Sequence, residues 1–292
     1  MNIKYIGYIL LLLSFTACTV EEIEYYKKQI YITYSGEQTH TMKIKATTTD
    51  TLISVYCGGS IAPDKDVTIT LNVDEDALDS LNGVKFSSTT DYLKLLPDSC
   101  FEIKSYQTTI KSGSVYGTMP VSFKTDKIDP LQKYVLPLSI KTSSVYEINQ
   151  SLKTVFITVN LINKYSGLYR FNGNAVEEGK TSKAKITREQ NFIVAGEHAV
   201  LMHAESKTFE KDGNNYLIKA IINADNTITM TSNDQANLKV ENCLPYTGIT
   251  SDPTIDNKYD PTTGNMRLIY KYNDFTKTGK MRIVVVDLIK VG

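Results

Sequence analysis

The sequence is poor in the residues on which many metal and sugar sites depend. Its 292 residues include no Trp, three His and four Cys. Three His and no Cys-x-x-Cys pair leave little material for a zinc site. Without Trp, a surface that stacks against sugar rings must rely on Tyr, whose ring is a narrower platform. We therefore expect no metal, no cofactor and a limited aromatic surface for glycans.

An excess of positive charge is also missing. The chain has 32 Lys and Arg residues against 32 Asp and Glu residues, and no basic block occurs along it. Because proteins bind phosphate backbones through clustered Lys and Arg, the charge pattern excludes nucleic acid as a partner.

Catalytic motifs are absent as well. The sequence has no Gly-x-Ser-x-Gly elbow, phosphate loop or dinucleotide-binding fingerprint. His198 and His203 stand five residues apart in a strand-like segment, so we expect them on opposite faces and not on one ion. The acidic residues of the segment 74–79 open a short helix, where they act as caps and solvated charges. The sequence therefore predicts a protein that is not an enzyme.

The N-terminus combines a short apolar run with a cysteine. The run from Ile6 to Phe15 is too short to span a bilayer as a helix, and two small residues separate it from Cys18. This pattern resembles the lipobox of bacterial lipoproteins, although Phe15 stands where Leu is usual. The resemblance implies that residues 1–17 are a lipoprotein signal peptide and that Cys18 carries the lipid. An ordinary secretory signal with a chance cysteine is the alternative.

Residues 18–28 follow as an acidic tether that contains Glu21, Glu22 and Glu24. The acidic run resembles the surface-export signal of many Bacteroidota lipoproteins, and a plain solvated tether is the alternative. Several acyl chains hold a protein firmly on a membrane. We expect a lipid-anchored protein of the outer membrane, facing the cell exterior, with the membrane as one partner.

The rest of the chain consists of strand patterns in two blocks, which predicts an all-β protein. In residues 29–162, apolar residues alternate with polar ones in four segments: 66–73, 116–123, 134–140 and 155–161. Their spacing predicts an immunoglobulin-like β-sandwich, in which Pro120 marks an edge strand. One helical turn is predicted from Asp74 to Leu81, with Asp74 or Asp76 as its N-cap.

The second block, residues 163–292, has longer strand patterns that follow one another through hairpin turns such as 211–215 and 224–226. This organisation predicts an antiparallel meander or a small β-barrel. The expected strands are 168–172, 183–187, 199–205, 216–223, 227–231, 238–242, 266–272 and 281–289.

Several short motifs carry a family resemblance. In the first block they are 57–59, 63–67, 92–97 and 133–140, and in the second 165–169 and 259–265. The first block resembles the N-terminal β-sandwich domain of Bacteroidota surface lipoproteins, which also precedes the barrel of some secreted endo-β-N-acetylglucosaminidases. The second block is similar to C-terminal domains that accompany it. Proteins of this kind are typically encoded among polysaccharide-utilisation genes, so the resemblance implies a glycan-handling role but no defined activity.

Three cysteines remain after Cys18, namely Cys57, Cys100 and Cys243. An odd number leaves at least one free thiol. Both a Cys57–Cys100 disulfide and two buried free thiols are compatible with the sequence.

The segment 244–265 is long for a hairpin connection and rich in aromatic and polar residues. We take it as the candidate glycan-binding loop, with Tyr246, Asp256, Asn257, Tyr259 and Asp260 as ligand residues. A structural loop whose tyrosines cover the end of the barrel is the alternative. The acids of this loop lack the dense Asp-x-Asp spacing of calcium motifs, so a polar turn is favoured over a calcium site.

We therefore expect a non-enzymatic surface lipoprotein that binds or helps to capture glycans. The alternative is a structural, adhesin-like or accessory subunit of an outer-membrane complex, with a protein partner and no affinity for sugars.

Overall fold

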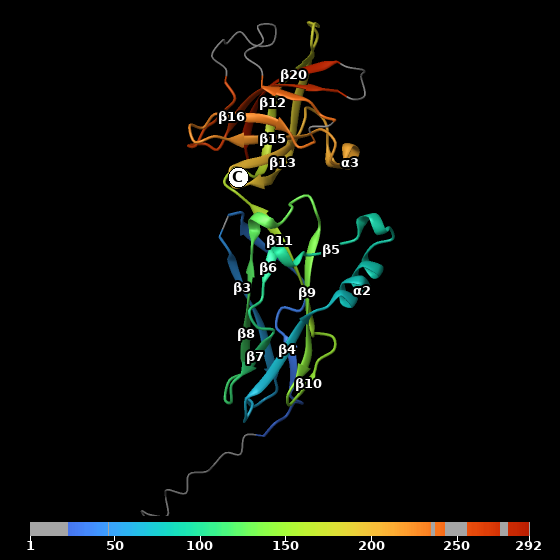
Figure 1. The fold of residues 1–292 in the computed structure, drawn as a ribbon, viewed down its shortest axis with the longest axis vertical. Coiled ribbons are helices and arrows are strands. Elements are labelled where there is room, and N and C mark those ends of the chain that lie inside the picture. Colours follow the sequence, from blue (N-terminus) through green and yellow to red (C-terminus); the bar gives the residue numbers. More distant parts are fainter. Residues whose placement is uncertain (1–22, 46, 235–236, 243–255, 275–279, 292) are drawn as a thin grey trace, which may run out of the picture.

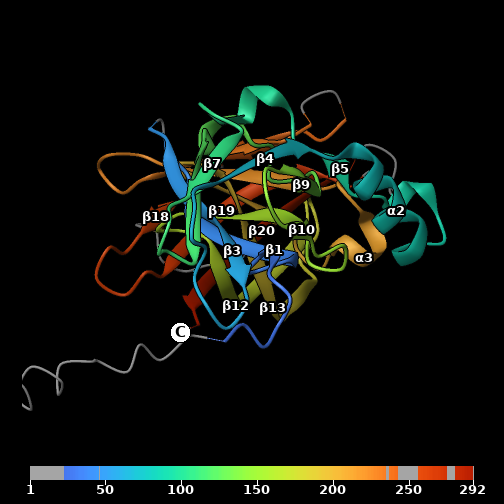
Figure 2. The same cartoon turned by 90° about the horizontal axis from the view of Figure 1, so that it is seen from below.

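The computed structural model describes residues 23–45, 47–234, 237–242, 256–274 and 280–291. Within these residues the chain is nearly all β, as predicted, and forms two domains stacked end to end (Figure 1). Two α-helices occur in the described part, α2 (Glu75–Lys85) and α3 (Phe209–Asp212). Both lie on the same side of the long axis (Figure 2).

The N-terminal domain is a sandwich of two sheets. In spatial order, the first sheet contains β10 (Glu147–Ile148), β1 (Gln29–Ile32), β3 (Thr49–Gly58), β8 (Tyr116–Phe123) and β6 (Phe101–Glu102). The second contains β2 (Gly36–Lys43), β11 (Thr154–Ile162), β9 (Tyr134–Ser143), β4 (Val67–Val73) and β7 (Gln107–Ile110), with β5 (Lys94–Leu95) beside β9. The predicted sandwich is confirmed, and the alternating apolar rows of β4, β8, β9 and β11 form its core.

Two local predictions in this domain have different outcomes. Asp74 caps α2, because its Oδ1 accepts a hydrogen bond from the Ala77 amide at 3.0 Å. The helix continues to Lys85, four residues beyond the predicted turn. The prediction that Pro120 marks an edge strand is wrong, because β8 lies between β3 and β6 and Pro120 pairs with Leu52 of β3. The short β6 pairs only with Ser122 and Phe123, so within the described residues Pro120 has no paired strand on that side.

Cys57 and Cys100 are both buried free thiols. Burial raises the pKa of each thiol. They act as small apolar core residues of the sandwich, which decides between the two alternatives that the sequence left open.

The C-terminal domain is one antiparallel sheet that curls into a nearly closed barrel, as predicted. Its order is β16 (Ile228–Ser232), β15 (Leu217–Ile222), β14 (Ala199–His203), β13 (Lys183–Gly196), β12 (Gly167–Glu177), β20 (Met281–Lys290), β19 (Met266–Asn273) and β17 (Val240–Asn242). The short β18 (Lys258–Tyr259) pairs with β19. Strand β13 is much longer than the predicted 183–187, and α3 occupies part of the predicted 211–215 turn.

A side chain helps to close the barrel, beside the backbone bridge between Thr227 and Lys258. The Asn242 Oδ1 accepts from the Met230 amide at 2.8 Å, and its Nδ2 donates to the Met230 carbonyl at 3.3 Å. The amide side chain thus joins β17 to β16 as a neighbouring strand would, and it satisfies two backbone groups at the seam.

Tyrosine fills much of the barrel interior. Tyr169, Tyr270 and Tyr272 are almost completely buried together with Phe171 and Phe192. The Tyr169 hydroxyl donates to the Tyr165 carbonyl at 3.0 Å, and that of Tyr272 donates to Glu205 at 2.7 Å. Because their hydroxyls have hydrogen-bond partners, these tyrosines can be buried in the core.

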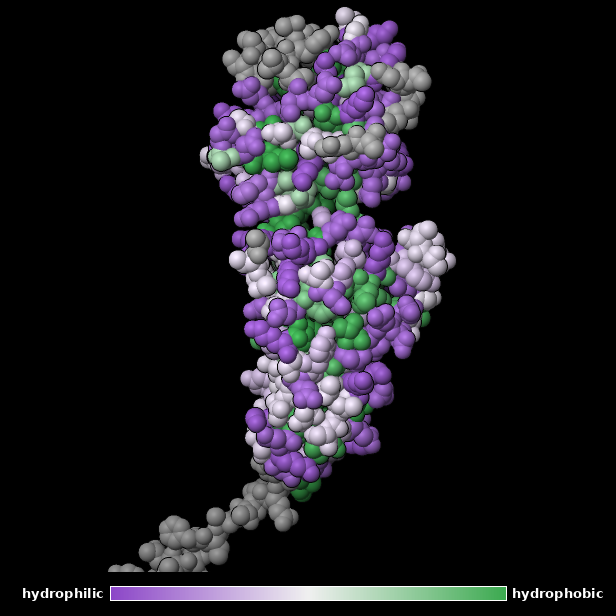
Figure 3. Space-filling view, viewed as in Figure 1, coloured by the Kyte–Doolittle hydropathy of each residue, from purple (hydrophilic) through white to green (hydrophobic). Residues whose placement is uncertain are grey.

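The two domains meet at a narrow waist where apolar residues show between them (Figure 3). Val194 of β13 belongs to the core of the sandwich, although it lies in the barrel strand. The Asn163 side chain donates to the carbonyls of Gly196 and Ala199 at 2.7 and 2.9 Å. These contacts attach the barrel to the end of β11. No helix in the described residues is long and apolar enough to cross a membrane.

Candidate binding groove on the C-terminal domain

A groove of about 700 Å³ lies on the outer face of the barrel beside β18. Its polar lining comes from four strands at one level of the sheet. Asn172 of β12 stands opposite Asp287 of β20, Asp287 opposite Arg267 of β19, and Arg267 opposite Lys258 of β18. Residues directly opposite on neighbouring strands lie side by side on one face. The four side chains therefore form a continuous polar row along the groove.

Two charged side chains of the polar row form an ion pair with each other. The Arg267 Nε donates to the Asp287 Oδ1 at 2.5 Å, and both side chains are about half exposed. An exposed pair of this kind contributes little to stability, so its groups remain open to exchange for a polar ligand. Ile289, which is 46 % exposed, adds an apolar surface beside the row.

A tight turn forms one wall of the groove. The Asp260 carboxylate accepts hydrogen bonds from the Thr263 hydroxyl at 2.6 Å and from the Thr262 amide at 2.9 Å. These bonds, the hydroxyl first, hold the pKa of Asp260 below its usual range. Gly264 ends the turn with a φ of +78°, a conformation that favours glycine.

The structure places the predicted ligand residues in different roles. Asp256 is exposed and lines the groove, and Asp260 lines it from the turn. Tyr259 also borders the groove, but only 2 % of it is exposed, and its ring packs edge-on against Tyr165 with 4.9 Å between centroids. It offers no free face for a sugar. Tyr246 lies outside the described residues.

Asn257 has a structural role at the seam of the barrel. Its Oδ1 accepts from the Ile269 amide, its Nδ2 donates to the Asn242 Oδ1 at 3.1 Å, and its carbonyl accepts from the Ile228 amide at 2.8 Å. The side chain connects β19 with the closing residue Asn242. Its hydrogen-bonding groups are thus already engaged within the protein.

The sequence did not single out Asn172, Arg267 and Asp287. Each occupies an outward position in a strand whose inward residues are apolar, so each looks like an ordinary solvated residue. The signal that identifies them is their shared level in the sheet, and this level depends on the register between β19 and β20 and on the pairing of β20 with the distant β12.

A second polar cluster lies at the barrel interior and is satisfied internally. Arg282 forms a two-pronged ion pair with Glu205, and the Tyr272 hydroxyl also donates to this carboxylate. His203 is fully buried between the Gln190 side chain at 3.0 Å and the Gly213 carbonyl at 2.8 Å. Burial lowers the pKa of His203 and favours its neutral form. Among the described residues, no group of three or more His, Cys, Asp or Glu could hold a metal ion.

The fold and the groove define a two-domain β protein with a candidate binding surface on its second domain. A family model described as an N-terminal domain matches residues 26–147, and a companion model described as C-terminal matches residues 153–288. The chain therefore belongs to the two-domain family that these paired models define, and the family resemblance found in the sequence is confirmed.

Solved structures from Bacteroides share the complete fold. A protein of unknown function from Bacteroides ovatus has a TM-score of 0.67 at 19% identity, with 90% of this chain and 94% of that chain covered. A multidomain protein including DUF1735 from the same organism has a TM-score of 0.64 at 18% identity, with 90% of this chain and 94% of that chain covered. An auxiliary nutrient binding protein from Bacteroides thetaiotaomicron has a TM-score of 0.60 at 15% identity, with 86% of this chain and 90% of that chain covered. No curated protein matches the sequence.

Proposed function

We propose that this chain is a non-enzymatic, lipid-anchored surface protein that captures glycans in the groove of its C-terminal domain. The observation that carries the proposal is the polar row of Asn172, Asp287, Arg267 and Lys258 along the groove. Sugar hydroxyls both donate and accept hydrogen bonds, so an amide, a carboxylate and two cations can all serve them.

The size and apolar part of the groove fit the same ligand class. A volume of about 700 Å³ falls within the range of small-molecule sites. Ile289 offers an apolar contact for the C–H face of a sugar ring. Since the described residues of the groove include no exposed aromatic ring, hydrogen bonds would supply most of the affinity. The neighbour described as an auxiliary nutrient binding protein shares this fold and supports the proposal.

The state of the carboxylates supports binding over hydrolysis. A glycosidase needs one carboxylic acid with a raised pKa and a second carboxylate beside the scissile bond. The pKa of Asp260 is lowered by its turn, and Asp287 is bound to Arg267. Neither group resembles the general acid of a glycosidase.

Calorimetric titration against a panel of neutral and acidic polysaccharides tests the proposed site. We expect Asp287→Ala to weaken binding by about tenfold or more, because charged groups form the stronger hydrogen bonds. Glu189→Ala is a matched control, since Glu189 pairs with Arg170 across neighbouring strands in the same sheet but lies outside the groove. It should leave the affinity unchanged.

Three outcomes would contradict the proposal. An Asp287→Ala protein with wild-type affinity would place the site elsewhere. Failure of the wild-type protein to bind any member of the panel, together with co-purification of another outer-membrane protein, would favour the accessory-subunit alternative. Release of reducing sugar from the panel would show that the protein is an enzyme.

A further inference from the structure

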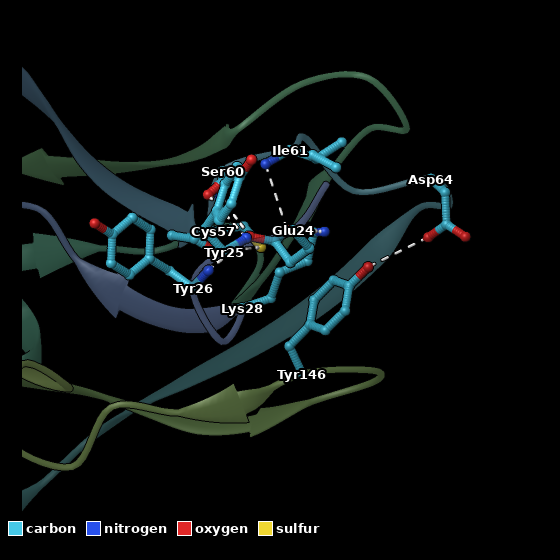
Figure 4. Close-up of polar contacts among 10 residues, drawn as sticks. Glu24, Tyr25, Tyr26, Lys28, Cys57, Ser60, Ile61, Asp64 and Tyr146 are labelled. Atoms are coloured by element: carbon cyan, nitrogen blue, oxygen red, sulfur yellow. Dashed lines mark hydrogen bonds and ion pairs between the residues drawn. The ribbon is translucent and has the colours of Figure 1, made fainter. Parts of the chain in front are cut away.

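The chain docks onto the sandwich before its first strand begins. The Glu24 carboxylate accepts a hydrogen bond from the Ser60 amide at 2.5 Å and another from the Ile61 amide at 3.3 Å, and it forms an ion pair with Lys28 (Figure 4). The Tyr25 amide donates to the Ser60 hydroxyl at 3.2 Å. Residues 24–28 of the expected tether are therefore fixed to the loop that follows β3.

The receiving loop is shaped for this contact. Gly59 has a φ of +136°, which side chains with a Cβ rarely adopt. A Cβ at this position would lie 2.9 Å from the Lys28 Cγ and 3.1 Å from the Glu24 Oε2. Glycine thus permits both the backbone conformation and the close approach of the two charged side chains.

Large apolar and aromatic side chains remain exposed in and beside the docked segment. Ile23 is 59% exposed, and Tyr25 and Tyr26 are each 74% exposed. Figure 4 shows the Tyr26 ring directed away from the Glu24–Lys28 contacts. Large apolar and aromatic side chains are usually buried in a folded domain. Here a fixed backbone exposes three of them close together along the chain, which suggests that they contact another surface.

Further exposed residues lie at the same end of the sandwich. Tyr116, at the start of β8, stands opposite Tyr56, which precedes the receiving loop by a few residues. Tyr116 is 54% exposed, and its ring stacks on Tyr56 with 6.2 Å between centroids. Val145, after the end of β9, is also partly exposed. We call Ile23, Tyr25, Tyr26, Tyr116 and Val145 the tether-side tip.

Docking at Glu24 also shortens the connection to the expected lipid. Only Thr19 to Ile23 separate Cys18 from Glu24. The stretch from Cys18 to the docked Glu24 spans at most roughly 22 Å when fully extended, whereas a tether free as far as Lys28 would span roughly 36 Å. The tip is thus held within reach of the lipid headgroups.

We propose that the tether-side tip rests in the headgroup region of the bilayer, with Ile23, Tyr25 and Tyr26 as its main contacts. The inference rests on the proposed anchor at Cys18. Tyr is favoured at membrane interfaces because its ring is apolar and its hydroxyl can remain in contact with water. Lipid and tip together then set the orientation of the sandwich. The barrel, which carries the groove, lies at the end away from the tether-side tip (Figure 1).

Charge at the tip agrees with a neutral lipid surface. Lys27 pairs with Glu147 at 2.6 Å, and Lys111 pairs with Asp66 at 2.7 Å. Because both lysines are already paired with carboxylates, we expect the contact to show no preference for anionic lipid.

Single-tryptophan fluorescence tests the contact, since the natural chain contains no Trp. A chain that starts at Thr19 is attached through an N-terminal His tag to phosphatidylcholine vesicles with nickel-chelating and brominated lipids. Tyr26→Trp reports on the tip. Tyr34→Trp is the matched control, because Tyr34 is 71% exposed but lies beyond the other end of β1.

We expect Trp at position 26 to lose most of its emission to the brominated lipid and Trp at position 34 to keep it. Equal emission from both positions, whether quenched or not, would overturn the inference. The artificial attachment makes this result independent of the native lipid. Fractionation of a Cys18→Ala variant in cells tests the anchor separately, so failure of the anchor and failure of the tip contact are distinguishable.

Discussion

Tyrosine illustrates how one residue type serves different purposes in this protein. Tyr169 and Tyr270 are fully buried in the barrel, whereas Tyr25 and Tyr26 are largely exposed beside the docked tether. Tyr259, predicted as a sugar platform, packs against Tyr165. Burial raises the pKa of Tyr259 above the ordinary value for tyrosine. The different roles of these tyrosines depend on packing and not on their residue type.

Glu24 provides a prediction at the scale of a residue. Hydrogen bonding to Lys28, followed by that to the Ser60 amide, lowers the pKa of Glu24 from 4.5 to about 2. Because the pKa is lowered in the folded state, the ionised Glu24 carboxylate stabilises the docked segment fully above about pH 4.5. This stabilisation is lost as the pH falls through 2. We expect Lys28→Ala to raise the pKa of Glu24 and thereby to move the loss of docking to higher pH.

An NMR titration of the Glu24 carboxyl carbon measures this change. Lys27→Ala is the control, because Lys27 pairs with Glu147 and not with Glu24. A Lys28→Ala protein in which Glu24 still titrates near 2 would show that the ion pair is not the main cause.

Strand β12 shows how a single element shapes the barrel. It pairs with β13 on one side and with β20 on the other, and Gly173 stands opposite Val286. A Cβ on Gly173 would lie 2.7 Å from the Val286 Cα and still closer to the Val285 carbonyl oxygen. Glycine therefore permits the close approach of two strands where the sheet curls.

Gly173→Ala should accordingly destabilise the protein by about 1–3 kcal/mol, because the backbones of β12 and β20 must move apart. Gly83→Ala in α2 is the matched control. A Cβ on Gly83 would meet nothing within 4 Å, and Ala favours a helix over Gly, so this variant should gain about 0.5–1 kcal/mol. Thermal unfolding measures both, and a loss of similar size in the two variants would contradict the role of strand packing.

At the scale of the whole molecule, the two domains divide the proposed tasks. The docked tether lies at the far end of the sandwich, and the groove lies on the barrel beyond the waist (Figure 1). If both proposals hold, this separation would let the sandwich keep the groove away from the bilayer.

The anchor itself gives the corresponding prediction. Cys18→Ala should release the protein from the membrane fraction, because the thiol that would carry the lipid is removed. Thr19→Ala is the control and should stay in the membrane fraction. Immunoblotting of membrane and soluble fractions measures the distribution, and a Cys18→Ala protein that remains in the membrane would refute the anchor.

The two domains show which structural features can be predicted from the sequence. The alternating apolar rows of β4 and β9 and the Asp74 cap are local, and both predictions are confirmed. The full length of β13 was missed because residues 189–196 do not alternate cleanly, and their pairing with β12 and β14 compensates for the weak local signal. The polar row of the groove was missed because it depends on the register between strands and on the pairing of β20 with β12, which is distant in the chain.

The sequence by itself determined the all-β class, the two blocks and the family, because alternation, turn residues and short motifs are properties of neighbouring residues. Only the tertiary structure decided that Asn257 closes the barrel, that Tyr259 is buried, and that Asn172, Asp287 and Arg267 line one groove. These outcomes depend on the register between strands, which places residues from distant parts of the chain side by side and is set by packing of the whole sheet.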